Sequence, residues 1–292
     1  MKEYPQIKTI EANTLMKGMA YMTAPVEFAH PDGQPLKLML LCPWIGEADP
    51  DQDKRFPLIV FIQGSAFCTP DQYRKIPQLS MFAQAGYVVA TISHRSCLDG
   101  NPFPAFLEDI KTAVRFLRAH ADEYHIDPDR VAAWGSSSGG CGALLLGMTA
   151  DDPEYKTDEY MEYSDGVSAV VDCFGPARAE QSIESYLAGE DIPYKECIAA
   201  LLGPRTSENI KRCSDISPYV LLEKGRSCPP VLILHGDADI TVPYSQSEDF
   251  YKSLIDHGVD AGMVRVCGAP HERSFWSCEV LAEIKAFLDS HI

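Results

Sequence analysis

Basic residues are scarce in this chain of 292 residues, and long apolar runs are absent from it. Its 25 Lys and Arg stand against 42 Asp and Glu, which gives a formal net charge of −17. Nucleic acids and anionic membranes bind basic surfaces, so this deficit argues against both as partners. No segment approaches the roughly 20 apolar residues that cross a bilayer, and residues 1–10 contain no apolar signal-peptide core. With Met1 at the start of the chain, we expect a cytoplasmic protein.

Paired cysteine motifs are also absent. The ten cysteines are scattered and form no C-x-x-C pair, which argues against a zinc ribbon or a thioredoxin-like centre. Several of them fall in apolar runs, as Cys42, Cys173 and Cys267 do, so buried and reduced thiols are the simplest interpretation. We therefore expect neither a metal nor a cofactor.

The order of apolar segments predicts an α/β fold. Strand-like runs occur at 20–28, 36–42, 58–63, 87–93, 130–134, 167–174, 230–235 and 262–267. Helical periodicity occupies 73–85, 105–124, 138–150, 245–257 and 278–291. Antiparallel-type strands followed by alternating strand and helix predict a mostly parallel eight-stranded sheet flanked by helices. A hydrophobic content of 46% is ample for one domain over residues 1–292.

One segment breaks this alternation. Residues 176–228 form short polar helices and turns before the next strand, and we expect them to be a small cap insertion. Its aromatic and apolar side chains either line a substrate pocket or pack the cap onto the body; they are Tyr186, Ile192, Tyr194, Leu201 and Leu202.

Residues 131–139 read Val-Ala-Ala-Trp-Gly-Ser-Ser-Ser-Gly, an apolar run that ends in G-x-S-x-G with Ser137 at its centre. This pattern is typical of a nucleophile elbow, where a strand reverses sharply into a helix. The small residues Gly135 and Gly139 relieve the crowding around a strained middle residue. The start of the helix would aim the N–H of Ser138 at a reacting oxygen, which makes it the first candidate oxyanion donor.

A serine hydroxyl needs a base in hydrogen-bond reach, and the base needs an orienting carboxylate. The strand-like run 230–235 leads into a loop that contains Asp239, and the next run leads into a loop that contains His271. The order Ser137, Asp239, His271 is the order of the α/β-hydrolase triad. Asp237 lies in the same loop and is the alternative acid. His235 ends a buried strand, and we interpret it as a packing or loop-fixing residue.

Six separated motifs resemble the esterase/lipase branch of the α/β-hydrolase superfamily. They are Gln63–Phe67, Phe103–Asp109, Ile126–Val131, the Ser137 elbow, His235–Pro243 and the His271 loop. They are most similar to the bacterial group of feruloyl and acetyl xylan esterases. The resemblance implies an α/β-hydrolase fold, the triad named above and no cofactor. The family's His-Gly-Gly oxyanion motif is replaced by Gln63-Gly64-Ser65, so the implied oxyanion donors are the N–H groups of Gly64, Ser65 and Ser138.

These residues favour a serine carboxylesterase. By the resemblance, its substrates would be small-molecule or oligosaccharide esters, carrying acetyl or hydroxycinnamoyl groups on plant-carbohydrate fragments. The alternative enzyme is a prolyl-peptidase-like serine exopeptidase, because such enzymes use the same order of triad residues. A hydrolase fold retained as a non-catalytic binding module is the third hypothesis. Whether the chain forms a homo-oligomer stays open.

Overall fold

The computed structural model describes residues 8–292, apart from the side chain of Cys213. Nine strands form one sheet in these residues: β1 (Ala20–Met22), β2 (Val26–Ala29), β3 (Leu36–Pro43), β4 (Phe56–Ile62), β5 (Val88–Ile92), β6 (Ile126–Ser136), β7 (Ala169–Cys173), β8 (Val231–Gly236) and β9 (Ala261–Val266). Their spatial order is β1-β3-β5-β4-β6-β7-β8-β9, and β2 also pairs with β3. Six strands are parallel to one another, in the spatial order β5, β4, β6, β7, β8 and β9, whereas β3 is antiparallel to β5. The expected mostly parallel α/β sheet is confirmed.

The expected number of eight strands is wrong by one. The run predicted at 20–28 is two short strands, and both pair antiparallel with β3. Pro25 lies directly before β2 and has no N–H to donate to a ladder, so it interrupts what would be one edge strand.

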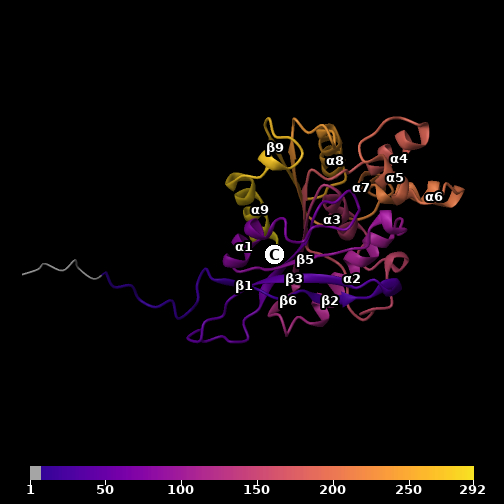
Figure 1. Ribbon diagram of the computed structural model, residues 1–292. Coiled ribbons are helices and arrows are strands. Elements are labelled where there is room, and N and C mark those ends of the chain that lie inside the picture. Colours follow the sequence, from indigo (N-terminus) through magenta and orange to yellow (C-terminus); the bar gives the residue numbers. More distant parts are fainter. Residues whose placement is uncertain (1–7) are drawn as a thin grey trace, which may run out of the picture.

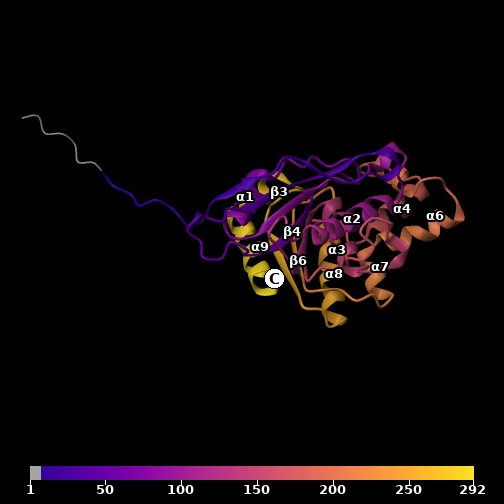
Figure 2. The same ribbon diagram turned by 90° about the horizontal axis from the view of Figure 1, so that it is seen from below.

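Two helical layers cover the sheet (Figures 1 and 2). One face packs against α1 (Ile76–Gln84) and α9 (Cys278–His291). The other packs against α2 (Ala105–Ala119), α3 (Ser138–Met148) and α8 (Tyr244–Asp256). Alternate residues of each buried strand contribute to the two cores, as Val60 and Phe61 of β4 do. A parallel sheet buried on both faces accounts for the uniformly apolar strands in the sequence.

The cap segment contains α4 (Ala179–Ala188), α5 (Lys195–Leu202), α6 (Ser207–Arg212), the 3₁₀ turn η4 (Cys213–Ile216) and α7 (Pro218–Glu223). Figure 1 shows α4, α5 and α6 gathered at one end of the molecule, on the side away from α1 and α9. The interpretation of residues 1–292 as one domain with a cap stays a prediction, and residues 1–7 lie outside the described part of the chain.

The remaining short elements are the 3₁₀ turns η1 (Pro31–Gly33), η2 (Cys97–Asp99), η3 (Pro153–Tyr155) and η5 (Arg273–Phe275). Within residues 8–292, none of the helices has the length and apolar character needed to span a bilayer.

Candidate active site

Ser137 occupies the sharp turn between β6 and α3 in a backbone conformation that is costly for a residue with a side chain. Its φ is 54° and its ψ is −129°. A Cβ atom on Gly135 would lie 1.9 Å from the carbonyl oxygen of Gly139, and one on Gly139 would lie 2.0 Å from that of Ile62. The two glycines of the motif are therefore required by backbone approach, as the sequence predicted. The Ser137 N–H donates to the Cys173 carbonyl at 2.9 Å and fastens the elbow to β7.

The three predicted triad residues meet above the carboxyl ends of β6, β8 and β9. Ser137 Oγ lies 2.9 Å from His271 Nε2, and His271 Nδ1 lies 2.7 Å from Asp239 Oδ2. Because a carboxylate only accepts, Nδ1 carries the imidazole proton, and Nε2 is free to accept the serine proton. The Asp239 side chain is fully buried, whereas that of His271 is 13% exposed and so can be reached by a substrate.

Asp239 is held as a carboxylate. Burial alone would raise its pKa, but hydrogen bonds from His235, His271 and the Val242 N–H outweigh burial and hold the pKa well below its usual range. Its Oδ1 accepts the N–H groups of Thr241 and Val242 at 2.7 and 3.0 Å. These bonds fix the carboxylate in the orientation that His271 needs.

The alternative acid, Asp237, turns away from the histidine. Its Oδ1 accepts the Gly268 N–H at 2.6 Å, and its Oδ2 pairs with the Arg265 guanidinium at 2.6 Å. The two carboxylates of the loop therefore have separate tasks: Asp239 orients His271, and Asp237 joins the loop to the end of β9.

The proposed oxyanion loop runs from the end of β4 alongside the elbow. The N–H of Gly64 donates to Ser136 Oγ at 3.2 Å, and the N–H of Ser65 donates to Ser138 Oγ at 3.0 Å. Both of these expected oxyanion donors are thus bonded to hydroxyls of the elbow in this structure. The N–H of Ser138 belongs to the first turn of α3, where a helix has no acceptor of its own for its N–H groups. Ser138 therefore remains the first candidate oxyanion donor.

The replacement of glycine by Ser65 does not strain the loop. The left-handed residues are the next two, Ala66 and Phe67, with φ of 53° and 64°. The Ser65 hydroxyl donates to the Cys68 carbonyl and closes this turn. Gln63, which stands where the family has histidine, is buried, and its Nε2 donates only to the adjacent Gly64 carbonyl at 3.2 Å among the described contacts.

Sequence reasoning missed the residues that hold the His271 loop. Glu272 accepts from Lys75 Nζ at 2.6 Å and from Trp276 Nε1 at 2.8 Å, and the side chains of Lys75 and Glu272 are largely buried. The ring of Phe174 meets that of His271 edge to face, with centroids 4.8 Å apart. Lys75 and Glu272 are 197 positions apart, so no local pattern indicates their pairing.

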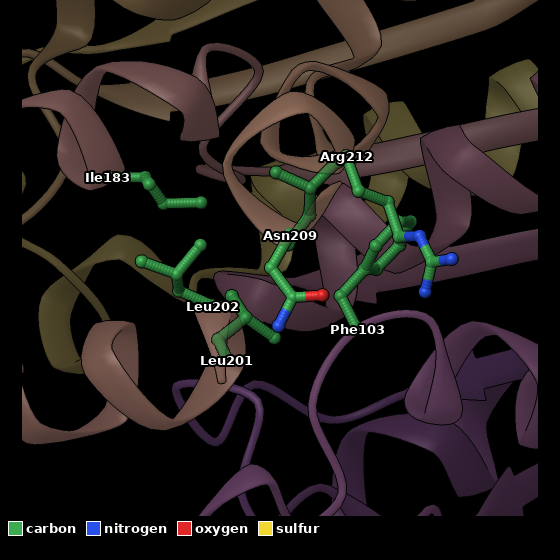
Figure 3. A pocket seen from close by; sticks show the side chains of 7 residues that line it. Phe103, Ile183, Leu201, Leu202, Asn209 and Arg212 are labelled. Atoms are coloured by element: carbon green, nitrogen blue, oxygen red, sulfur yellow. The ribbon is translucent and has the colours of Figure 1, made fainter. Parts of the chain in front are cut away.

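A small pocket lies in the cap (Figure 3). It is lined by Phe103, Ile183, Leu201, Leu202, Asn209, Arg212 and Ile216. Leu201 and Leu202, two of the expected pocket residues, contribute to this wall and are buried. Of the other three, Tyr186 and Ile192 pack against the core, and Tyr194 is 56% exposed. Tyr186 and Ile192 therefore pack the cap onto the body, whereas Leu201 and Leu202 line a pocket to which none of the three triad residues contributes.

The expectation of no metal and no cofactor stays a prediction. In the part of the chain that the structure describes, no group of three or more His, Cys, Asp or Glu side chains is arranged to hold a metal ion.

The mostly parallel sheet, the strained elbow and the hydrogen-bonded chain Ser137–His271–Asp239 define an α/β-hydrolase fold with a triad arrangement at the carboxyl ends of its strands. The chain belongs to the BD-FAE family, whose model matches residues 48–254.

The comparisons with known proteins include the esterase LipC of Mycobacterium tuberculosis, which is 29% identical over 204 residues, covering 69% of this chain and 49% of LipC. A truncated form of a carbohydrate esterase from gut microbiota is 25% identical, with a TM-score of 0.77 over 96% of this chain and 98% of that one. A bifunctional GH43-CE protein of Bacteroides eggerthii is 26% identical, with a TM-score of 0.73 over 91% of this chain and 38% of that one. The chain thus spans about half the length of the curated relatives it matches.

Proposed function

We propose that the protein is a serine carboxylesterase that hydrolyses short acyl or hydroxycinnamoyl esters of plant-carbohydrate fragments. The observation that carries the proposal is the continuous hydrogen-bonded chain from Ser137 Oγ through His271 to the buried carboxylate of Asp239. This chain activates a hydroxyl that is otherwise a weak nucleophile.

The reaction follows from this geometry. Ser137 Oγ attacks the ester carbonyl as His271 Nε2 takes its proton, and Asp239 stabilises the imidazolium that forms. The Ser138 N–H stabilises the tetrahedral oxyanion, joined by the N–H groups of Gly64 and Ser65 once they exchange their serine hydroxyl acceptors for the oxyanion. His271 then protonates the leaving alcohol. Water then attacks the acyl-enzyme. His271 takes the proton of the water as general base and returns it to Ser137 Oγ as the acid product leaves.

Membership of the BD-FAE family supports an ester as the substrate, and the similarity to two carbohydrate-esterase structures supports a carbohydrate alcohol. We therefore place acetyl and feruloyl esters of short xylan-type oligosaccharides first among the substrates to be tested.

The test combines covalent labelling with a substrate panel. A fluorophosphonate should label Ser137 stoichiometrically, and Ser137→Ala should abolish labelling and lower hydrolysis of p-nitrophenyl acetate by about 10⁴-fold or more. Ser290→Ala is the control, because Ser290 is exposed in α9 and its hydroxyl donates to carbonyls of the same helix. Acetyl and feruloyl oligosaccharides should be turned over faster than aminoacyl arylamides. Faster amide turnover would replace the proposal by an exopeptidase, and an unlabelled Ser137 in folded protein would replace it by a binding module.

A further inference from the structure

Three thiols meet between the oxyanion loop and the cap, outside the catalytic chain. Cys68 Sγ lies 3.5 Å from Cys197 Sγ and 3.9 Å from Cys97 Sγ. The three residues come from three segments: Cys68 ends the oxyanion loop, Cys97 begins η2 and Cys197 lies in α5 of the cap. They are up to 129 positions apart in the sequence, so the fold alone brings them together.

The three thiols differ in access. Cys97 is only 2% exposed, whereas Cys68 and Cys197 are partly exposed. Burial, together with the neighbouring thiols, raises the pKa of Cys97 to about 12 and that of Cys197 to about 11. A small reagent can therefore reach the Cys68–Cys197 pair, whereas Cys97 is buried.

The cap is already attached to the body on one side of this cluster. The Phe103 N–H, in the segment after η2, donates to the Leu201 carbonyl of α5 at 2.9 Å, and Figure 3 shows Leu201 and Phe103 together in the wall of the pocket. The Cys97 N–H donates to the Phe67 carbonyl of the oxyanion loop at 3.0 Å. The contact between Cys68 and Cys197 joins the loop directly to the cap helix.

We propose that Cys68 and Cys197 are a redox-active thiol pair that closes reversibly into a disulfide between the oxyanion loop and the cap. The oxidant is a low-molecular-weight disulfide. The thiolate of one cysteine attacks a sulfur of the reagent and releases one thiolate, which leaves a mixed disulfide. The second cysteine, as thiolate, attacks its partner's sulfur and releases the other half of the reagent as a thiolate. The protein loses two protons and two electrons, and the reagent is reduced to two thiols.

Closure of this bond changes the active site. The two sulfurs must approach from 3.5 Å to a bonded distance of about 2 Å, a shift of about 1.5 Å that the two side chains, the loop and the cap helix share. The Ser65 hydroxyl donates a hydrogen bond to the Cys68 carbonyl, and this bond transmits the movement of Cys68 to the residues beside the elbow. A displacement of about 1 Å in a catalytic constellation lowers turnover by about 10²-fold at the upper end. We expect the oxidised enzyme to be at least about tenfold slower in kcat than the reduced enzyme.

The experiment uses the full chain with Cys267→Ser and Cys278→Ser, which removes two exposed thiols that would form mixed disulfides. Oxidised glutathione at mildly alkaline pH should lower the mass by two hydrogen atoms without leaving an adduct. Peptide mapping should locate the bond between Cys68 and Cys197. Dithiothreitol should restore both the mass and the rate of p-nitrophenyl acetate hydrolysis. Phosphonate labelling of Ser137 supplies a second measure of the site, and peptide mapping decides the pairing even if the enzyme proves inactive on esters.

Three variants separate the outcomes. Cys197→Ser should keep its basal activity, form no internal disulfide and resist inactivation. Cys97→Ser should behave like the parent, because Cys97 is not part of the pair. Cys228→Ser, a thiol elsewhere in the fold, should also behave like the parent. A bond mapped to Cys97, the absence of an internal bond, or a disulfide with unchanged kcat and labelling rate would overturn the proposal.

Discussion

His235 Nε2 lies 3.1 Å from Oδ2 of Asp239, and both side chains are fully buried. The same nitrogen lies 3.1 Å from the Val242 carbonyl, and Nδ1 lies 2.7 Å from Ser247 Oγ. Because Nε2 faces two acceptors, it carries the ring proton, and the Ser247 hydroxyl donates to Nδ1. His235 therefore helps to orient Asp239, and it donates to the same carboxylate oxygen as His271 does.

Replacing this second histidine should impair catalysis more than binding. In His235→Gln, Asp239 loses a fixed donor and gains freedom to turn away from His271, so we expect kcat to fall about tenfold with little change in KM. The steady-state kinetics of p-nitrophenyl acetate hydrolysis give both constants. His257→Gln is the control, since His257 bonds only within and beside α8. Equal kcat values for the two variants would show that His235 serves packing alone.

Substitutions of the two aspartates in the Asp239 loop should affect different properties, kcat for Asp239 and the melting temperature for Asp237. Asp239→Asn places an amide opposite His271 Nδ1 and favours the wrong tautomer, so kcat should fall by about 10³ to 10⁴ with KM nearly unchanged. Asp237→Asn weakens the bonds to Gly268 and Arg265 and should lower the melting temperature slightly while kcat stays near that of the parent. The reverse pattern in kinetics and thermal melting would reassign the acid to Asp237.

A side chain on Gly64 should disrupt the elbow. A Cβ atom there would lie 2.5 Å from the Ser136 carbonyl oxygen and 2.6 Å from the Cβ of Ser137, too close for either group to remain in place. Gly64→Ala should therefore lower kcat by about 10² or more, because it displaces both the nucleophile and the loop. Gly166→Ala is the control, where the nearest atom is the flexible Ser164 hydroxyl at 3.3 Å. Normal turnover by Gly64→Ala would mean that the loop stands farther from Ser137 in solution.

Asp172 should make stability depend on pH. It is buried in β7, its Oδ1 accepts the Gly175 N–H at 2.9 Å, and Oδ2 is without a partner among the described residues. Burial raises its pKa to about 7, against which the nearby His235 and the Gly175 bond act only partly. The stability from this protonated carboxyl is fully present below its unfolded pKa of about 4 and is lost as the pH rises through about 7.

The amide of the Asp172→Asn variant cannot ionise, so this variant does not lose stability as the pH rises through about 7. Its melting temperature should exceed that of the parent increasingly between pH 5 and about pH 8, by the equivalent of about 2–4 kcal/mol at the upper end. Asp53→Asn, at an exposed position, is the control and should show no such trend. An advantage of Asp172→Asn that does not grow with pH would mean that the carboxyl is ionised in the folded protein throughout this range.

Much of the fold and of the site could be predicted because the signals are local. The elbow needs small residues two positions to either side of Ser137, and the structure shows backbone contacts at both glycines that no side chain could fit. Asp239 and His271 were found because each follows an apolar run that forms a buried or half-buried strand. The division of residues 20–28 into two strands was missed, because Pro25 affects the pairing with β3 rather than the apolar pattern.

The sequence by itself determined the chain order of the triad, the sharp turn at Ser137 and the alternation of strand and helix, since backbone sterics and burial act over a few residues. Tertiary structure alone decided which N–H groups face the elbow hydroxyls, that Lys75 reaches Glu272, and that Cys68 touches Cys197. These contacts join segments between 72 and 197 positions apart. Their geometry depends on the lateral order of the strands and on how the cap packs, which local preferences do not specify.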